Sequence, residues 1–505
     1  MDLLHSLYYG FSVGFEPANI FACFVGVLMG TLVGVLPGIG PVGAISILLP
    51  STFRMNPVSA VIMLAGIYYG AMYGGSTTSI LVNIPGEAAS VVTCLDGYQM
   101  AREGRAGPAL GIAAFGSFIA GTAGLIGLML FALPLAKVAL DFGPPEYFAF
   151  ILFGLTLVGY LARGSTIKAF MMGALGLILS CIGLDWVDAT PRFNFNIVEL
   201  MDGIDMVPLA MGLFGISEIL LNVEQTTSPE ILKTKIKNLL PNVSDWMESI
   251  WAIIRGSVLG FFLGILPGGG GIIASFLSYS LEKKVSKNPN KFGKGAIQGV
   301  AGPESANNSA TAGAFVPFLT LGIPPNIVMA LLFGALLIHG IRPGPLFIRE
   351  HPDLFWGLIS SMYIGNLMLL VLNLPLIPVW VKILKIPYKI LFPLILLFCI
   401  IGAYSLNNRI FDLVLMFIFG IFGYLSRKFD YEPAPLILAF VLGPIFELNL
   451  RHSLLLSKGS FSIFFTRPIS AIAIILAIIL FATSFVPFFT KRKEEFKSAT
   501  LDEGP

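Results

Sequence analysis

Long apolar stretches recur along the whole chain and alternate with short segments rich in polar residues, glycine or proline. A membrane-spanning helix needs about 20 mainly apolar residues. Stretches that reach or approach this length lie near 18–36, 57–73, 109–136, 145–162, 166–184, 204–221, 250–266, 311–338, 355–383, 387–403, 410–425, 433–448 and 468–489. Several are interrupted or too long for one crossing, so we expect about twelve spans. The shorter apolar segments 41–50, 76–94 and 270–281 predict re-entrant or half-spanning helices.

The composition places these helices in a membrane. Of the 505 residues, 56% are hydrophobic and only 12% are charged, whereas soluble domains carry about 25% charged residues. So few charges cannot cover a globule of this size, and a lipid bilayer solvates the apolar exterior instead. We therefore predict an all-α polytopic membrane protein. The net charge of +2 gives no reason to expect a nucleic-acid partner.

The chain divides into two related halves. The predicted parts are a first membrane repeat, 1–221, a polar linker, 222–249, a second membrane repeat, 250–490, and a polar C-terminal tail, 491–505. GTLVGVLPGIG begins at Gly30 and GFFLGILPGGG at Gly260, an offset of 260 − 30 = 230 residues. NIPG at Asn83 is answered by GIPP at Gly322, an offset of 322 − 83 = 239 residues. Matches in the same order at slowly drifting offsets predict an internal repeat.

Charged loops predict that the two repeats have opposite orientations. The loop 282–294 holds five lysines and one glutamate, whereas the corresponding loop 51–57 holds only Arg54. Since cytoplasmic loops gather lysine and arginine, loops of such different charge fit opposite faces of the membrane. We therefore expect an inverted repeat with broken helices or re-entrant hairpins.

Two Leu-Pro-Gly segments predict places where a helix unwinds. Proline removes a backbone donor and runs of glycine do not hold a helix, so helical geometry should end after Leu36 and Leu266. Unwound carbonyls at membrane depth can hold a cation, and the next helix N-terminus can hold an anion. The candidate ion-binding residues are Gly38, Gly40, Gly268 and Gly270. The alternative is a kinked or tightly packed helix pair that binds no ligand.

Small polar residues gather in each half before an Ile-Pro dipeptide. Their hydroxyl and amide groups can hydrogen-bond a carboxylate or ligate a hard cation. The candidate substrate-binding residues are Ser76, Thr77, Thr78, Ser79, Asn83 and Pro85 in the first half and Asn307, Asn308, Ser309, Thr311 and Pro324 in the second. In the alternative interpretation these residues only hold helices together.

Ionisable candidates are few, and the sequence shows no catalytic set. Glu87, Asp96 and Glu304 lie beside the polar segments, while Arg105 and Arg342 stand in R-x-G-P contexts that are typical of solvated loops. The sequence contains neither G-x-x-x-x-G-K-[ST] nor H-E-x-x-H, the signatures of a phosphate-binding loop and a zinc protease. We therefore assign no catalytic residue. We expect neither an enzyme nor a bound cofactor, and no metal beyond a coupling sodium ion.

Five segments carry a resemblance to a known family: GVLPGIGP, YGGSTTSILVNIPGEAASVVTCLDG, GILPGGGG, GPESANNSATAGAFVPFLTLGIP and HGIRPGP. They closely resemble the large membrane subunit of the tripartite tricarboxylate transporter family, and the likeness runs from Asn19 to Pro468. The resemblance implies a bacterial inner-membrane carrier that works with a small four-helix membrane subunit and a periplasmic solute-binding protein. It also implies import of carboxylates, typically citrate and related di- or tricarboxylates, driven by a sodium or proton gradient.

Two positions depart from the family's usual pattern. Gln99 follows Tyr98 where the family often has proline, and Pro325 and Asn326 follow Pro324 where it usually has glycine and a small polar residue. The second departure falls inside the expected site, so it leaves the identity of the transported acid open.

Two other function classes compete with an ion-coupled carrier. A passive channel or a structural membrane subunit needs no closed site near the bilayer midplane, whereas paired broken helices build one. The membrane subunit of an ion-pumping decarboxylase would need a catalytic set, and the sequence shows none. For a carrier, we expect neutral donors and helix ends around 76–79 and 307–311 to hold the carboxylates. A co-transported cation, Na+ or H+, would compensate the remaining charge.

Overall fold

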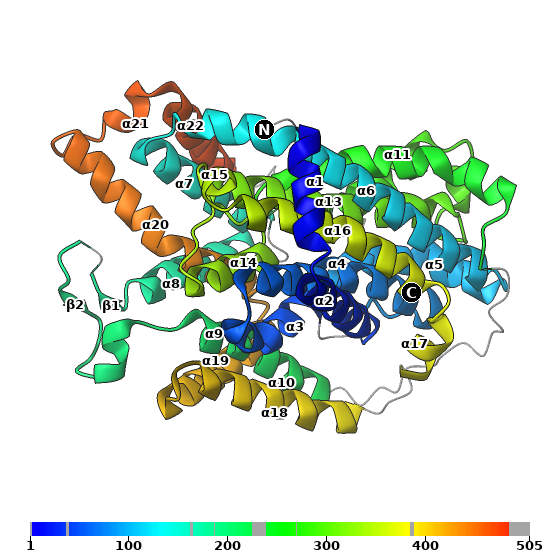
Figure 1. Ribbon diagram of the computed structural model, residues 1–505, viewed down its shortest axis with the longest axis horizontal. Helices are drawn as coiled ribbons and strands as arrows, with labels where there is room; N and C mark the ends of the chain where they lie inside the picture. The colour runs from blue at the N-terminus through cyan, green and yellow to red at the C-terminus, as the bar shows by residue number, and fades with distance from the viewer. Residues whose placement is uncertain are drawn as a thin grey trace.

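The structure is a computed structural model that describes residues 3–36, 40–161, 165–185, 187–224, 239–268, 270–383 and 388–483. These residues form a bundle of helices with one short antiparallel sheet (Figure 1). Eight of the described helices are long and apolar enough to cross a membrane, and five shorter apolar helices accompany them. The predicted class, a multi-pass helical membrane protein, is confirmed. The number of about twelve spans and the inverted orientation stay predictions.

The elements of the first half are α1 (Leu3–Gly14), α2 (Pro17–Val35), α3 (Gly40–Leu48), η1 (Leu49–Arg54), α4 (Pro57–Val82), η2 (Ala88–Ser90), α5 (Val91–Arg102), α6 (Ala106–Ala139), α7 (Pro144–Leu161), α8 (Thr166–Ser180), β1 (Gly183–Leu184), β2 (Pro191–Arg192), η3 (Val198–Asp202), α9 (Met206–Ala210), η4 (Met211–Ile216) and α10 (Ser217–Glu224). Those of the second half are α11 (Val243–Ile265), α12 (Gly270–Val285), η5 (Pro289–Lys291), α13 (Gln298–Leu321), α14 (Ile327–Ile338), α15 (Phe347–Glu350), α16 (Pro352–Asn373), α17 (Ile377–Ile383), α18 (Tyr388–Asn407), α19 (Ile410–Lys428), α20 (Ala434–Leu456), α21 (Ile463–Thr466) and α22 (Pro468–Thr483). The tail 491–505 and residues 225–238 of the predicted linker lie outside the described residues.

Helix α4 is longer than the hydrophobic pattern predicts. A separate half-span was expected over 76–94, but α4 continues through the polar residues to Val82. The helix tolerates these hydroxyl groups because they bond to carbonyls one turn back, as Ser79 Oγ does to Gly75 at 2.9 Å. It ends at Asn83, whose φ of 59° is left-handed.

The second half departs from the predicted boundaries at three places. The expected span 355–383 is divided between α16 and α17, because the helix ends at Asn373 before Pro375. The expected span 311–338 is divided between α13 and α14, because Gly322 takes a φ of 68° and two prolines follow Ile323. Helix α11 begins at Val243, inside the predicted linker, because Asn242 and Asp245 form a capping box.

Glycines bring the first long helix of each half into backbone contact with the broken helix that follows. An ideal Cβ placed on Gly30 of α2 would lie 2.5 Å from the Ile67 carbonyl oxygen of α4. One placed on Gly260 of α11 would lie 2.7 Å from Ala306 Cα of α13. The glycines differ by 260 − 30 = 230 residues and their partners by 306 − 67 = 239, the two offsets of the sequence repeat. The same close approach is therefore built in both halves.

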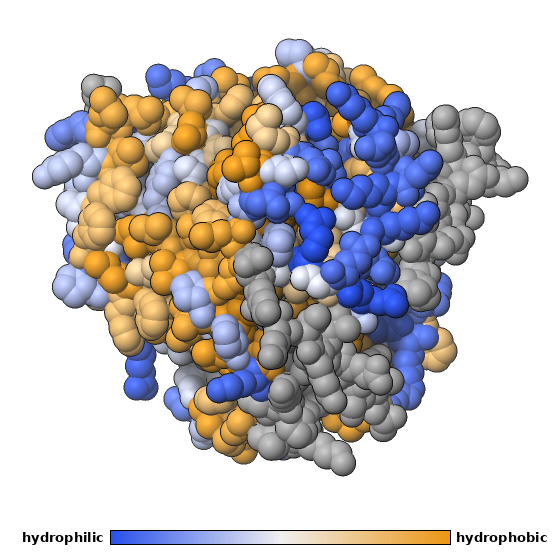
Figure 2. Space-filling model, turned by 90° about the vertical axis from the view of Figure 1, so that its right-hand side faces the viewer, coloured by the Kyte–Doolittle hydropathy of each residue, from blue (hydrophilic) through white to orange (hydrophobic). Residues whose placement is uncertain are grey.

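The outward face of α11 is apolar at helical spacing. Trp251, Ile254, Val258 and Phe262 are all exposed, whereas Gly260 on the opposite face is buried against α13. Such a stripe of large exposed apolar side chains needs lipid around it. Figure 2 looks onto the side of the molecule that carries α5 and α11, and it shows apolar and polar side chains gathered over separate parts of the surface.

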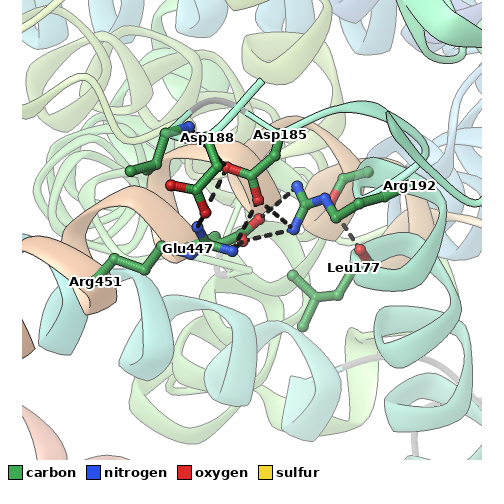
Figure 3. Close-up of polar contacts among 8 residues, drawn as sticks. Leu177, Asp185, Asp188, Arg192, Glu447 and Arg451 are labelled. Atoms are coloured by element: carbon green, nitrogen blue, oxygen red, sulfur yellow. Dashed lines mark hydrogen bonds and ion pairs between the residues drawn. The ribbon is translucent and has the colours of Figure 1, made fainter. Parts of the chain in front are cut away.

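A cluster of ion pairs holds the β1–β2 hairpin to α20 (Figure 3). The guanidinium of Arg192 lies 2.7 Å from Glu447 and that of Arg451 lies 2.8 Å from Asp185. Backbone N–H groups of Asp188 and Val187 donate to the Asp185 carboxylate and, with the two arginines, lower the pKa of that carboxyl. The hairpin is thereby fixed outside the helical bundle.

Candidate functional site

Each half contains a helix that breaks in the same way at an Ile-Pro dipeptide. Helix α4 ends at Asn83 and α13 at Gly322, both with a left-handed backbone. Each loop then supplies a side-chain cap to the next helical turn. Glu87 accepts a hydrogen bond from Ala89 N at 2.6 Å, and Asn326 accepts one from Met329 N at 3.0 Å. The two caps are separated by 326 − 87 = 239 residues, the offset of the sequence repeat.

The loop of each half reaches across to the broken helix of the other half. Asn307 Nδ2 on α13 donates to Glu87 Oε1 at 3.2 Å. Asn326 Nδ2 donates to the Tyr68 hydroxyl on α4 at 3.2 Å. The helix residues differ by 307 − 68 = 239 and the loop residues by 326 − 87 = 239. Exchanging the halves therefore maps one contact onto the other, as a pseudo-two-fold axis requires. We call these two hydrogen bonds the crossed contacts.

Asn307 leaves a buried acceptor open at the centre of this arrangement. The residue is fully buried, and its Oδ1 has no hydrogen-bond partner among the described residues. It lies against the N-terminus of α12, where an ideal Cβ on Gly271 would come 3.3 Å from Asn307 Cγ. One turn along α13, the Thr311 hydroxyl donates to the Asn307 carbonyl at 3.1 Å. An orphaned buried oxygen needs a donor or a cation, so Asn307 can receive a ligand.

The Leu-Pro-Gly segments adjoin the crossed contacts in the second half. Gly268 has a φ of 74°, and its N–H donates to the Pro325 carbonyl at 2.8 Å. Gly40 and Gly270, with φ of 62° and 41°, begin α3 and α12. Gly38 lies outside the described residues. Helices α2 and α11 end before extended residues at Leu36 and Leu266, as predicted, and the next helices begin at Gly40 and Gly270. Pro324 is buried in the loop that Gly268 contacts.

The polar residues of α4 are mostly bonded within the protein. Ser76 donates to Glu304 at 2.6 Å, and Thr78 donates to a carbonyl of α2 at 2.7 Å. Ser79 donates to carbonyls of its own helix and of the η2 turn. Thr77 is also buried. These contacts are those that the packing interpretation predicts, and they leave Asn83 and Pro85 as the partly exposed members of the first group.

The polar residues of α13 face three different neighbours. Asn308 Nδ2 donates to Ser117 of α6 at 2.7 Å, and Ser309 donates to a carbonyl of α11 at 2.7 Å. Successive helical residues point about 100° apart, so adjacent side chains do not share a face. Only Asn307 and Thr311, four residues apart, lie together beside the crossed contacts.

The comparison with known proteins identifies the family of this chain. Residues 20–438 match the family described as the tripartite tricarboxylate transporter TctA family. The chain belongs to this family. An uncharacterized 52.8 kDa protein in the TAR-I ttuC' 3' region of Agrobacterium vitis is 51% identical over 495 residues, which are 98% of this chain and 99% of that protein. An uncharacterized protein in the TAR-II ttuC' 3' region of the same organism is 52% identical over 236 residues, which are 47% of this chain and 98% of that protein. No solved structure matches the chain significantly.

Membership of a transporter family confirms the predicted family and fits a membrane transport subunit rather than an enzyme. For this TctA-family chain, sequence reasoning missed Tyr68 and named Asn326 only as a departure from the family pattern. Both could have been found from the repeat, because the offset of 239 residues carries Asn307 back to Tyr68 and Glu87 forward to Asn326. The arginines of the R-x-G-P segments have no hydrogen bond to the crossed contacts among the described residues: Arg105 pairs with Asp245 at 2.5 Å and Arg342 is exposed.

Proposed function

We propose that this chain is the large membrane subunit of an ion-coupled secondary transporter that imports carboxylates across the bacterial inner membrane. Its partners are a small four-helix membrane subunit and a periplasmic solute-binding protein. The substrates belong to the di- and tricarboxylate class, and the coupling ion is Na+ or H+. The observation that carries the proposal is the pair of crossed contacts, which joins the broken helices of both halves at one place.

The crossed contacts suit a site that opens and closes. Each consists of one hydrogen bond, which contributes about 0.5–3 kcal/mol depending on charge. Two bonds of this size can break and re-form within a transport cycle. The permanent connections between neighbouring helices are provided by the glycine contacts instead.

The groups at the crossed contacts also suit a carboxylate and a compensating cation. They present amide, phenol and carboxylate groups, with the N-terminus of α12 beside Asn307. A helix N-terminus carries about half a positive charge and favours a carboxylate. The open Asn307 Oδ1 can accept a hydrogen bond from a ligand or coordinate a cation. Recognition by the neutral amide, phenol and helix-end groups allows release, whereas a permanent arginine clamp would hold a polyanion tightly.

The test is reconstitution of the chain with its small membrane subunit and binding protein in proteoliposomes. A panel of radiolabelled carboxylates is offered with a sodium gradient, a pH gradient or no gradient. We expect accumulation only when all three proteins and a gradient are present. Equilibration without any gradient would instead indicate a channel, and release of CO2 would indicate a decarboxylase subunit.

Variants of the crossed contacts link this activity to the site. Asn307→Leu and Asn326→Leu should each lower the rate of uptake by about tenfold, because one lost contact worth 1.4 kcal/mol corresponds to that factor. Asn449→Leu is a matched control, since Asn449 on α20 donates to a carbonyl of its own helix. Equal uptake by all three variants at equal protein level would place the site elsewhere.

A further inference from the structure

Glu304 is a buried carboxylate whose hydrogen-bond partners are neutral hydroxyl groups. It lies on α13 with 1% of its surface exposed. Ser76 of α4 donates to one carboxylate oxygen at 2.6 Å, and Thr93 of α5 donates to the other at 2.5 Å. Among the described residues, no lysine, arginine or histidine forms an ion pair with it. Glu304 therefore has hydrogen bonds but no counter-charge.

The titratable groups that face Glu304 from the packed helices do not supply that charge. Tyr73 of α4 and Cys94 of α5 interact with it, and both carry neutral groups near pH 7. On α11 and α12, Arg255 is already paired with a carboxylate, since it donates to both oxygens of Glu282 at 2.8 and 2.6 Å. Helix α6 presents the Ser117 hydroxyl to α13.

Two other buried glutamates of this chain show how a permanent negative charge can be accommodated by an arginine. Glu146 lies 2.6 Å from Arg467, and Glu282 lies 2.6 Å from Arg255. An ionised carboxylate without such a partner costs several kcal/mol at membrane depth, and the cheaper solution is to bind a proton. The contrast between these pairs and Glu304 indicates that Glu304 changes its charge.

The hydrogen bonds around Glu304 fit both protonation states without movement of heavy atoms. When the carboxylate is ionised, Ser76 and Thr93 both donate to it. When Oε2 carries the proton, it donates to Ser76 Oγ, and the Ser76 hydroxyl rotates toward the Met72 carbonyl at 3.5 Å. Ser76 therefore donates to the ionised Glu304 carboxylate and accepts from the protonated Glu304 carboxyl group.

Glu304 is also placed next to the proposed site. It precedes Asn307 by three residues, so the two side chains lie one turn apart on the same side of α13. Asn307 makes a crossed contact with Glu87, while Ser76 and Thr93 come from the opposite half. A change of charge at Glu304 thus occurs where the two halves meet.

We propose that Glu304 binds the proton that is co-transported with the carboxylate, which makes H+ the coupling ion. This inference rests on the proposed function. Glu304 takes a proton from water on the side to which the site is open and forms an O–H bond. It returns that proton to water on the other side, so the carboxylate is regenerated in each cycle.

The test separates net transport from exchange in the reconstituted three-protein system. For the wild type in sodium-free buffer, an imposed pH gradient should drive carboxylate uptake, and substrate addition should acidify the lumen as read by a trapped dye. Glu304→Gln resembles the protonated carboxyl, so the loaded protein still changes state but cannot release a proton and return empty. We expect net uptake to fall by at least about tenfold, while exchange against internal unlabelled substrate stays within about threefold.

Two further variants make the result specific to a titratable group at this position. Glu304→Asp should recover part of the net uptake, because it restores a group that can bind a proton. Glu146→Gln, which changes a buried glutamate with an arginine partner, should keep uptake driven by the pH gradient. Gel filtration verifies that each variant is folded.

The contrary outcomes are distinct from one another. Wild-type uptake that follows a sodium gradient and causes no lumen acidification would overturn the proposal even if no variant were folded. Unchanged pH-driven net uptake by Glu304→Gln would also overturn it. Absence of both uptake and exchange in the wild type, whatever the gradient and carboxylate, would instead refute the proposed function.

Discussion

Replacing Gly30 by alanine tests whether the first two long helices are in backbone contact. In the structure, the added Cβ would lie 2.5 Å from the Ile67 carbonyl oxygen and 2.9 Å from Ile67 Cα. Ordinary C···O contacts are about 3.3 Å or longer, so α2 and α4 would have to separate by about 0.8 Å. The neighbouring atoms belong to the backbone, and no side-chain rotation can relieve the clash.

The expected cost follows from packing and helix propensity together. Forcing an extra methyl group into a packed contact costs about 1–3 kcal/mol, while alanine in place of glycine returns up to about 1 kcal/mol of helix propensity. Gly173 on α8 isolates the second contribution, because an added Cβ there would have nothing within 4 Å. The difference between Gly30→Ala and Gly173→Ala should therefore equal the packing cost, about 1–3 kcal/mol.

The measurement is the unfolding midpoint of detergent-solubilised protein, followed by loss of the monodisperse peak in gel filtration after heating. Gly30→Ala should have a lower midpoint than Gly173→Ala. Gly260→Ala should match Gly30→Ala, because its Cβ would lie 2.7 Å from Ala306 Cα in the equivalent contact. Equal midpoints for Gly30→Ala and Gly173→Ala would refute the close approach of α2 and α4.

Three further predictions concern charge and the proposed site. The Asp185 carboxyl has a pKa below its ordinary value in the folded protein, so the stability it contributes is present above about pH 3.9 and is lost as the pH falls further. In Asp185→Asn, the unfolding midpoint should therefore fall less between pH 6 and pH 3 than it does in the wild type. An equal fall in both proteins would contradict this. Arg105→Gln and Arg342→Gln should keep carboxylate uptake within about threefold of wild type, because Arg105 is paired with Asp245 and Arg342 is exposed. Abolished uptake at normal protein level would mean that arginine holds the substrate. Asn307→Ala should raise the substrate concentration for half-maximal uptake more than Ser309→Ala does, since the Ser309 hydroxyl is bonded to α11, and the reverse order would count against the assignment.

The architecture could be predicted as far as local sequence determines it. Low charge and long apolar runs indicated a helical membrane protein, and two short matches indicated the repeat. The left-handed ends at Asn83 and Gly322 follow from residue types that tolerate this conformation before Ile-Pro. The length of α4 could not be predicted, because polar residues inside a buried helix resemble a loop until their internal hydrogen bonds are known.

The candidate site was predicted only in part, because composition does not say which way a helix faces. Asn307, Asn308 and Ser309 form one polar cluster in the sequence, but Asn307 bonds to the loop after α4, Asn308 to α6 and Ser309 to α11. The partners of Asn307 and Asn326 come from the other half, so their contacts depend on how the halves pack. The repeat offset of 239 residues related these partners in the sequence, since it pairs Tyr68 with Asn307 and Glu87 with Asn326.

The sequence halves and the packed units of the molecule are not the same. Helix α6 belongs to the first half but lies along α13 of the second, where Asn308 donates to Ser117 at 2.7 Å (Figure 1). Helix α16 of the second half packs against α4 of the first, where the Tyr73 hydroxyl donates to Asn366 at 2.5 Å. A movement of α13 that opens the contact of Asn307 with Glu87 must therefore carry α6 along, or it must break the hydrogen bond between Asn308 and Ser117. A unit that moves with these bonds intact contains helices from both halves of the sequence, so the predicted linker is not the boundary of such a unit.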